Sequence, residues 1–281
     1  MDEAPTLSEL KPDYFFPALH EFRHAALFKD LNWVWEAVVD LRGYILKALS
    51  GEIISSNRVV SKLGDAKLIL LPGKKDEERV GMLSSEGYIV VEEDKFLEEL
   101  GIAMGEGTTI EPGVVIKSPT IIGRNVELRQ GAYIRGSVII GDHAVVGHTT
   151  EVKNSLFMDH AEAGHFAYVG DSILGMRVNL GAGAKLANLE LRSPREKESH
   201  TVRSFEIPIK EERYQTGLQK LGAILGDDVE MGCNTVTSPG ALIGPGSWVY
   251  ANTTVGKGLY GQNVIIRSRG GKTEVFPRRE S

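Results

Sequence analysis

The clearest pattern along this chain is an apolar residue at every sixth position. Between residues 110 and 152 the interval is unbroken, and its members are Ile110, Ile116, Ile122, Leu128, Ile134, Ile140, Val146 and Val152. A period of six matches neither the 3.6-residue period of an α-helix nor the two-residue period of a half-buried strand. It is typical of hexapeptide parallel β-helices, in which each flat face contributes one inward aliphatic side chain and glycine serves the corners.

The same interval returns toward the C-terminus, at Leu225, Met231, Thr237, Ile243, Val249 and Val255. Thr237 is its one weak member. Between the two blocks the phase continues, provided that one residue is dropped twice, through Phe157, Ala163, Val169, Leu174, Leu180 and Leu186. Residues 190 to 223 are rich in charge and have no period of six, so we expect them to form an arm extruded from the β-helix.

The N-terminal residues follow other patterns. Apolar residues at helical spacing from Leu31 to Leu49 predict an amphipathic helix, with Trp33 and Trp35 packed against a neighbour. The stretches "KLILLPG" and "GYIVVEED" predict short strands, and "DKFLEELG" predicts a capped helix. These helices would cap an open end of the β-helix, pack along one of its faces or recognise a partner.

These patterns divide the chain into three parts. We expect a small helical and mixed α/β region over residues 1–104, a mainly β domain over 105–265 and a basic C-terminal tail over 266–281. The 32 glycines among 281 residues agree with a fold that turns repeatedly.

Composition narrows the function classes. A net charge of -6 gives no electrostatic case for binding nucleic acid. Cys233 is the only cysteine, so no disulfide can form within the chain, as is usual in a reducing compartment. The acidic start lacks an apolar signal region, and no run is long enough for a membrane span. We expect a cytoplasmic protein.

Coil geometry singles out Arg135 and Lys153. Three hexads make one coil, so residues separated by three hexads lie one above the other, and these two cations each follow an inward aliphatic residue. Stacked cations repel unless an anion bridges them or their side chains splay into solvent. One interpretation is therefore a site for a phosphate or diphosphate, and the other is a solvated pair.

Four histidines form a second constellation. The separation from His143 to His160, and equally from His148 to His165, is one coil less the dropped residue, so they are expected to stack in two pairs. A zinc site is one interpretation, because "YIRGS" and "VVGH" resemble γ-class carbonic anhydrases. That family has an aspartate and a histidine where this chain has Ser137 and Lys153, and a lysine is a poor zinc ligand, which counts against a metal.

From residue 131 to 188 the chain resembles the left-handed β-helix acetyltransferase domain of the bifunctional N-acetylglucosamine-1-phosphate uridyltransferase/glucosamine-1-phosphate acetyltransferase. The pieces "AYIRG", "EVKNS", "AGHFAYVGD", "VNLGAG" and "LAN" occur in that order. The likeness extends more weakly over about residues 105 to 260. Nothing before residue 100 resembles the nucleotidyltransferase half, since no glycine-rich phosphate loop follows a first strand.

The resemblance implies a role for each matching residue. His165 takes the place of the general base that deprotonates the sugar amine, and imidazole suits this task near neutral pH. Arg135 and Lys153 fall on the sugar-phosphate site. The sugar is bound by positions that match Tyr168, Asn179 and Asn188. The coenzyme A site matches Cys233 and Ala251, with Arg267 supplying charge for its phosphates.

Two positions depart from the family pattern. Leu189 stands where the family has the tyrosine of an Asn-Tyr pair, and Cys233 stands where it has a serine. Both bear on the identity of the substrate. The arm is also longer than the corresponding family loop.

The resemblance implies an enzyme that transfers an acyl group from acetyl-CoA or another acyl-CoA to an amino sugar phosphate or sugar nucleotide, in the chemistry of UDP-N-acetylglucosamine. No metal is required, because the thioester is already activated. Family sites form between subunits, so we expect a homotrimer. The alternatives are a non-catalytic protein that binds sugar nucleotides or supports assembly, favoured by Leu189, and the zinc enzyme.

Overall fold

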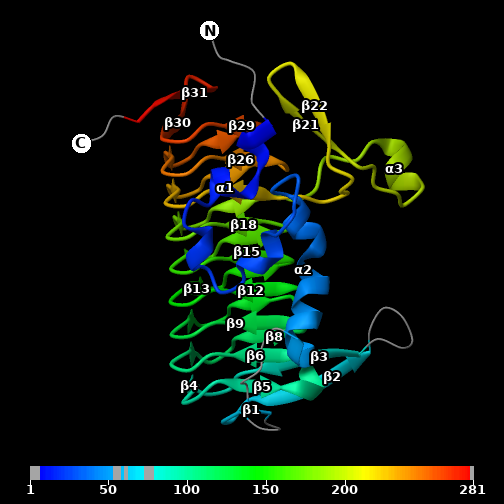
Figure 1. Cartoon of the computed structure of the whole chain (residues 1–281), viewed down its shortest axis with the longest axis vertical. Helices are drawn as coiled ribbons and strands as arrows, with labels where there is room; N and C mark the ends of the chain where they lie inside the picture. The colour runs from blue at the N-terminus through cyan, green and yellow to red at the C-terminus, as the bar shows by residue number, and fades with distance from the viewer. Residues whose placement is uncertain (1–6, 53–57, 60–62, 73–78, 279–281) are drawn as a thin grey trace.

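The computed structural model describes residues 7–52, 58–59, 63–72 and 79–278. Within these residues, short strands stack along one axis into a three-sided prism (Figure 1). Most neighbouring strands of the prism run parallel, and its antiparallel pairs lie at the two ends. The predicted left-handed parallel β-helix is confirmed. No helix in these residues is long and apolar enough to cross a membrane.

Three sheets form the faces of the prism, here called faces A, B and C. Face A contains, in spatial order, β1 (Arg58–Val59), β5 (Lys95–Leu97), β6 (Ile102–Met104), β9 (Thr120–Ile122), β12 (Val138–Ile140), β15 (Ser155–Phe157), β18 (Ile173–Leu174), β23 (Ala223–Leu225), β26 (Ala241–Ile243) and β29 (Gly258–Tyr260). Face B contains β2 (Lys67–Pro72), β3 (Arg79–Ser84), β8 (Val115–Lys117), β11 (Tyr133–Ile134), β14 (Glu151–Lys153), β17 (Tyr168–Gly170), β20 (Lys185–Leu186), β25 (Val236–Thr237) and β28 (Thr254–Val255). Face C contains β31 (Lys272–Pro277), β30 (Val264–Arg269), β27 (Trp248–Val249), β24 (Glu230–Met231), β19 (Asn179–Leu180), β16 (Glu162–His165), β13 (Val145–His148), β10 (Glu127–Leu128), β7 (Thr109–Ile110) and β4 (Ile89–Val90).

The strand register agrees with the hexapeptide pattern. Ile134 pairs with Ile116 and with Val152, which lie one full coil of three hexads away in each direction. Val152 pairs with Val169, one position short of a full coil, where a residue is dropped. Leu174 pairs with Leu225 on the far side of the arm, because the arm is inserted into this coil without disturbing the stack.

The periodic residues form one continuous core inside the prism. Every member of the unbroken block from Ile110 to Val152 is at most 2% exposed. The weak member, Thr237, is also fully buried, and its hydroxyl is the one buried side-chain polar atom without a hydrogen-bond partner in the described residues. Buried residues two positions before the periodic ones, such as Val126, Ala132 and Ala144, complete the interior.

A second hydrophobic core covers the outside of face A. The strands of this face bury consecutive side chains, as in "VII" of β12, instead of alternating between buried and exposed. The N-terminal segment packs on them, with Phe15, Trp35 and Leu41 fully buried (Figure 1). Its elements are η1 (Leu7–Leu10), α1 (Pro12–Phe15), η2 (Leu19–Glu21), η3 (Ala25–Phe28), α2 (Glu36–Lys47) and η4 (Ala48–Glu52). The helices thus pack along a face.

The predicted helix from Leu31 begins later in the structure. The carboxylate of Glu36 accepts the backbone N–H groups of Asn32 and Trp33, at 2.8 and 2.9 Å, and α2 starts there. The two tryptophans serve packing, as expected: the rings of Trp33 and Trp35 are stacked with centres 5.5 Å apart.

The prediction of a helix for "DKFLEELG" is wrong. Residues 95–97 form strand β5, which pairs antiparallel with β6, and only η5 (Glu98–Leu100) makes a helical turn, of the 3-10 type. Gly101, at φ 64°, reverses the chain between the two strands. Strand pairing at the end of the prism overrides the local helix preference.

The predicted arm holds α3 (Pro194–Glu198) and a hairpin of β21 (Glu206–Ile209) and β22 (Glu212–Gln215). The hairpin packs on face A through buried Ile207 and Ile209, whereas α3 stands away from the prism (Figure 1). The basic C-terminal segment forms the β30–β31 hairpin, and its residues 279–281 lie outside the described part.

His24 makes the N-terminal packing sensitive to acid. Burial, assisted by nearby Arg23, lowers the pKa of His24 from 6.5 to about 4, and its Nδ1 lies 3.1 Å from the hydroxyl of Tyr44. As pH falls from about 6.5 to about 4, the imidazole of His24 is therefore protonated in the unfolded chain but stays neutral in the folded chain. We expect the free energy of unfolding to fall by about 3 kcal/mol across this window and no further below it.

The measurement is denaturant unfolding followed by tryptophan fluorescence at several pH values, compared with His24→Gln. Subtracting the variant removes the opposite contribution of Asp159 and Asp227, whose pKa values are raised by burial. An identical pH dependence in both proteins would contradict this prediction.

Candidate functional site

His165 lies where face C turns toward face B. It ends β16, and its register partner is His148 at the end of β13. The register places Ala182, Cys233 and Ala251 in successive coils above it, because Glu162, Asn179, Glu230 and Trp248 stack three positions earlier. We call this vertical set, from His148 to Ala251, the corner column.

The side chains of the corner column become small above His165. Backbone bonds follow the same line: Asn234 N–H donates to Ala182 O at 2.8 Å, and Asn252 N–H donates to Cys233 O at 2.9 Å. His165 and Cys233 are exposed. The exposed imidazole of His165 therefore lies below a row of small side chains in the corner column. Their small size leaves room for an extended ligand along the prism axis.

Arg135 and Lys153 stack on face B as predicted. The N–H of Arg135 donates to the carbonyl of Val152 at 2.8 Å, which places the cation directly beside Lys153 in the next coil. Each cation has a carboxylate partner: Arg135 Nη1 lies 2.6 Å from Glu151 Oε1, and Lys153 Nζ lies 3.5 Å from Asp171 Oδ2. The two carboxylates reduce the repulsion that the sequence alone implied.

Asp171 is the centre of a polar network at the corner between faces B and A. Its side chain is 7% exposed and accepts hydrogen bonds from the amides of Asn154, at 2.8 Å, and Asn188. Tyr168 lies against Asn188, and burial together with the charges of Asp171 and Glu151 raises the pKa of its phenol. Tyr168 and Asn188 thus join the cation stack.

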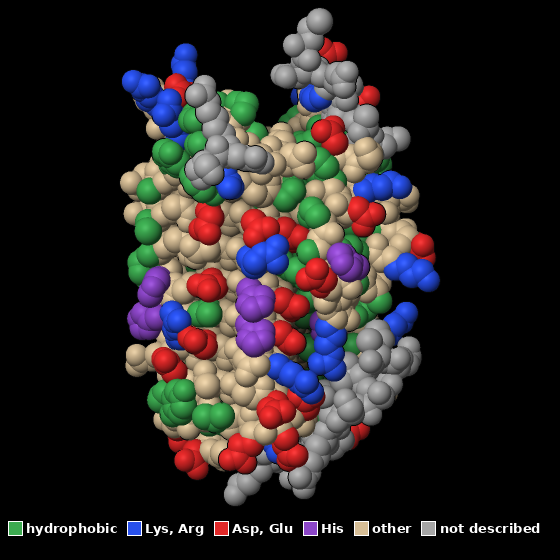
Figure 2. Space-filling model, turned by 60° about the vertical axis from the view of Figure 1, so that its left-hand side comes forward, with side chains coloured by type: hydrophobic (Ala, Val, Ile, Leu, Met, Phe, Trp, Pro, Cys, Tyr) green, Lys and Arg blue, Asp and Glu red, His purple; other side chains and the backbone are tan. Residues whose placement is uncertain are grey.

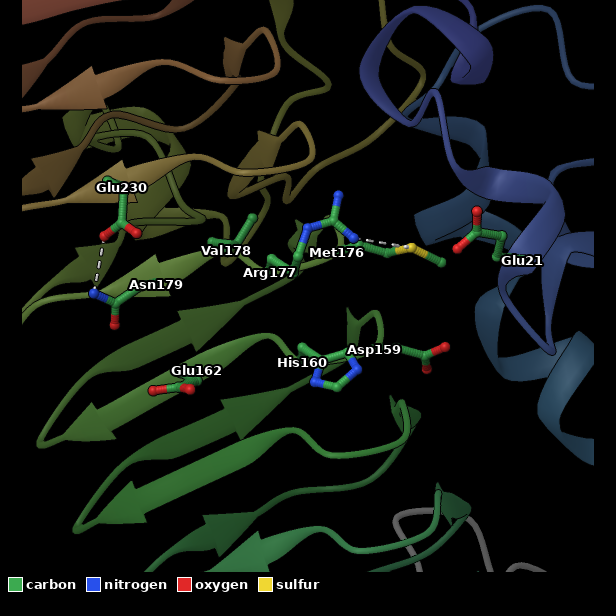
Figure 3. Close-up of a pocket in the computed structure, with 9 residues that line it drawn as sticks. All are labelled: Glu21, Asp159, His160, Glu162, Met176, Arg177, Val178, Asn179 and Glu230. Atoms are coloured by element: carbon green, nitrogen blue, oxygen red, sulfur yellow. Dashed lines mark hydrogen bonds between the residues drawn. The ribbon is translucent and has the colours of Figure 1, made fainter. Parts of the chain in front are cut away.

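Asn179 lies elsewhere. It begins β19 on face C, beside Glu162, and its Nδ2 donates to Glu230 Oε2 at 3.0 Å. Asn179 lines a pocket of about 600 Å³. Figure 3 shows it there with Glu230 and with Glu21 from η2. His165 follows Glu162, the register partner of Asn179, by three residues. It therefore lies about 10 Å from Asn179 along the strand direction, at about 3.3 Å per residue. One copy of the chain does not bring Asn179 to the cation stack.

Arg267 lies at the top of face C. It belongs to β30, four coils above His165, a rise of about 19 Å at about 4.8 Å per coil. Its Nε lies 2.9 Å from Glu274 Oε2, and its guanidinium lies 4.7 Å from the centre of the Phe276 ring. The cation is adjacent to the upper end of the corner column.

The two expected histidine pairs lie at opposite ends of the face C strands. Figure 2 shows histidine side chains gathered in two places on this side of the molecule. The rings of His143 and His160 stack with centres 4.8 Å apart, and His148 Nδ1 lies 3.0 Å from Gln130 O in the other pair. Among the residues that the structure describes, no three His, Cys, Asp or Glu side chains lie together in a way that could hold a metal ion.

The comparisons with known proteins agree with the resemblance seen in the sequence. Residues 116–238 match the family model of the GMPPB C-terminal domain. The chain is 32% identical over 214 residues to the bifunctional sugar-1-phosphate nucleotidylyltransferase/acetyltransferase of Sulfurisphaera tokodaii, covering 66% of this chain and 51% of that protein. It is 32% identical over 169 residues to the bifunctional protein GlmU of Methanococcus aeolicus, covering 60% of this chain and 39% of that protein.

The chain thus spans about half or less of the length of these relatives. Solved structures with a similar course include UDP-N-acetylglucosamine acyltransferase from Campylobacter jejuni, with a TM-score of 0.30 and 17% identity over 63% of this chain and 72% of that one. A mutant of AntD, an N-acyltransferase from Bacillus cereus solved with dTDP and coenzyme A, has a TM-score of 0.28 and 17% identity over 68% and 92%.

Proposed function

We propose that this chain, which resembles the acetyltransferase part of the bifunctional GlmU-type enzymes, is an acyl-CoA-dependent N-acyltransferase acting on a phosphorylated amino sugar. The observations that carry the proposal are an exposed imidazole, His165, at the turn into face B, and a stack of two cations, Arg135 and Lys153, on that face. The cations hold the phosphate of the acceptor.

The residues divide the reaction between them. The neutral sugar amine attacks the thioester carbonyl, so that a C–N bond forms and the C–S bond breaks. His165 takes the proton from the attacking nitrogen and gives it to the departing thiolate, which leaves as coenzyme A. Tyr168 and Asn188 orient the sugar above the cation stack.

The acyl donor lies along the corner column. Ala182, Cys233 and Ala251 leave space for the extended arm that carries the thioester, and Arg267 at the top contacts a phosphate of coenzyme A. Because Arg267 is already paired with Glu274, we assign it only a minor contribution to the affinity for coenzyme A.

The separation of Asn179 from the cation stack supports a site shared between subunits. Face A is covered by the N-terminal segment, so faces B and C are the two faces left for contact with other copies. In a homotrimer, face C of one subunit lies against face B of the next, and Asn179 of one copy then completes the site of its neighbour.

The second candidate is a protein that binds sugar nucleotides without turnover. Leu189, 37% exposed beside Asn188, favours it, because the acetyltransferase family has a tyrosine there.

The test is release of coenzyme A from acetyl-CoA with a panel of amino sugars that includes glucosamine 1-phosphate. Multiple turnovers with one acceptor class are expected, together with a mass in solution of three chains. Binding of acceptors without any release of coenzyme A would favour the second candidate.

A further inference from the structure

A third cation extends the stack on face B. Lys117 ends β8, and because Ile116 pairs with Ile134, which pairs with Val152, Lys117, Arg135 and Lys153 follow one another in successive coils. The spacing is one interstrand distance, about 4.8 Å, at each step. None of the sequence pieces that carry the family resemblance includes residue 117.

Lys117 differs from the other two cations in its partners. Arg135 and Lys153 each face a carboxylate, whereas no carboxylate in the described part of the chain pairs with Lys117. Its ammonium lies 5.2 Å from the centre of the Tyr133 ring, and the guanidinium of Arg135 lies 5.9 Å from the same ring. Tyr133 holds the two cations on one aromatic surface while leaving the charge of Lys117 without a neutralising anion.

A fourth cation approaches from the N-terminal segment. Arg42 on α2 donates from Nη1 to Ser137 Oγ at 3.4 Å, at the corner two residues after Arg135. Within the described residues it too has no carboxylate partner. Lys117 and Arg42 therefore carry positive charge that no carboxylate in the described residues balances, in a chain whose net charge is -6.

The surface below Lys117 is apolar. Lys117 pairs with Met82 of β3, which pairs with Ile69 of β2, and Ile69 is 36% exposed. Along one line of face B the structure thus presents two carboxylate-paired cations, one unpaired cation and two apolar side chains. A nucleoside diphosphate sugar has a matching order: its two phosphates would meet the cations, and its nucleoside would meet the apolar side chains.

We propose that Lys117 binds a second phosphate, so that the acceptor is a nucleoside diphosphate amino sugar in preference to a sugar 1-phosphate. The inference rests on the proposed function for its direction: the sugar lies toward His165, the phosphate nearest the sugar lies at Arg135 and Lys153, and the nucleoside-bearing phosphate lies at Lys117. Lys117 is a specificity-determining residue that touches the substrate and takes no part in proton transfer.

The test compares one amino sugar as its 1-phosphate and as its UDP and dTDP derivatives, in coenzyme A release by wild type, Lys117→Ala and Lys117→Arg. We expect Lys117→Ala to raise KM for the nucleotide sugars about tenfold, with kcat and the KM for the 1-phosphate unchanged. Lys117→Arg is expected to retain most of the preference. Lys11→Ala, which removes an exposed charge beside α1 on face A, is the matched control and is expected to change neither KM.

Three outcomes separate the two proposals. If the 1-phosphate is used and the nucleotide sugars are not, or if Lys117→Ala raises both KM values equally, the inference is overturned while the acyltransferase stands. If no acceptor is turned over, the acyltransferase fails, and calorimetric binding of UDP and dTDP decides the inference. Weaker binding to Lys117→Ala than to wild type would then support it, and equal binding or none would overturn it.

Discussion

Replacing His165 by alanine is expected to lower kcat for acyl transfer by about 10²- to 10⁴-fold, the usual contribution of a positioned general base. The imidazole is exposed at the turn from face C to face B, and the described residues offer its ring no hydrogen-bond partner that would assign it to the core. The amine loses its proton as the C–N bond forms, so removing the acceptor leaves this proton to water.

The matched control is His148→Ala, which removes an imidazole one coil below in the same corner column. His148 Nδ1 lies 3.0 Å from Gln130 O, so this ring is held by the backbone, and less than a tenfold loss is expected. Binding of acceptor and of coenzyme A to each variant is measured by calorimetry. A loss of binding in His165→Ala that equals its loss of rate would assign the residue to binding instead of proton transfer.

Replacing Gly147 by alanine is expected to cost about 3 kcal/mol or more in the free energy of unfolding. A Cβ atom at this position would overlap the carbonyl group and Cα of Gly164 in the next coil. Backbone cannot move aside as a flexible side chain can, so the two coils would have to separate. This tight approach also sets His148 and His165 one interstrand distance apart.

Gly164→Ala provides the comparison, since the same substitution one coil higher meets no backbone. Its nearest neighbour would be Arg129 Nη1 at 3.7 Å, an ordinary contact with a flexible side chain. We expect a change within about 1 kcal/mol, because alanine also restricts the unfolded chain. Denaturant unfolding of both variants gives the difference directly, and equal destabilisation would disprove the role assigned to coil contact.

The interior of the prism was predictable because one rule governs it. An inward aliphatic residue every six positions determines the faces, the stacking of successive coils with and without a dropped residue, and the insertion point of the arm. Packing of the N-terminal helices along a face was one of three alternatives, and the face was not identified, although consecutive apolar residues such as those of β12 carried the signal. The sequence of a strand that is buried on both sides is a continuous run of apolar residues. In a strand with one solvent-exposed face, apolar and polar residues alternate.

The candidate site was predictable in part for the same reason. The rule of three hexads per coil stacked Arg135 with Lys153 and, applied once more, would also have found Lys117. Spacing did not reveal that Glu151 and Asp171 pair with the cations, because side-chain direction decides which neighbour a carboxylate meets. The helix predicted over "DKFLEELG" failed because pairing with β6 depends on residues beyond its own window.

The covering of face A changes how the prism responds to disturbance. In a solenoid each coil contacts only the coils beside it, so the ends can open independently. Here the N-terminal segment shares one hydrophobic core with Ile121 of β9 and Leu242 of β26, and Phe15 O accepts the N–H of Asp227 at 2.9 Å. Coils far apart along the axis therefore pack against the same N-terminal segment, so we expect them to open together in one cooperative event. This N-terminal segment is also the first part of the described chain to be synthesised, whereas its bond to Asp227 can form only after most of the coils have been made.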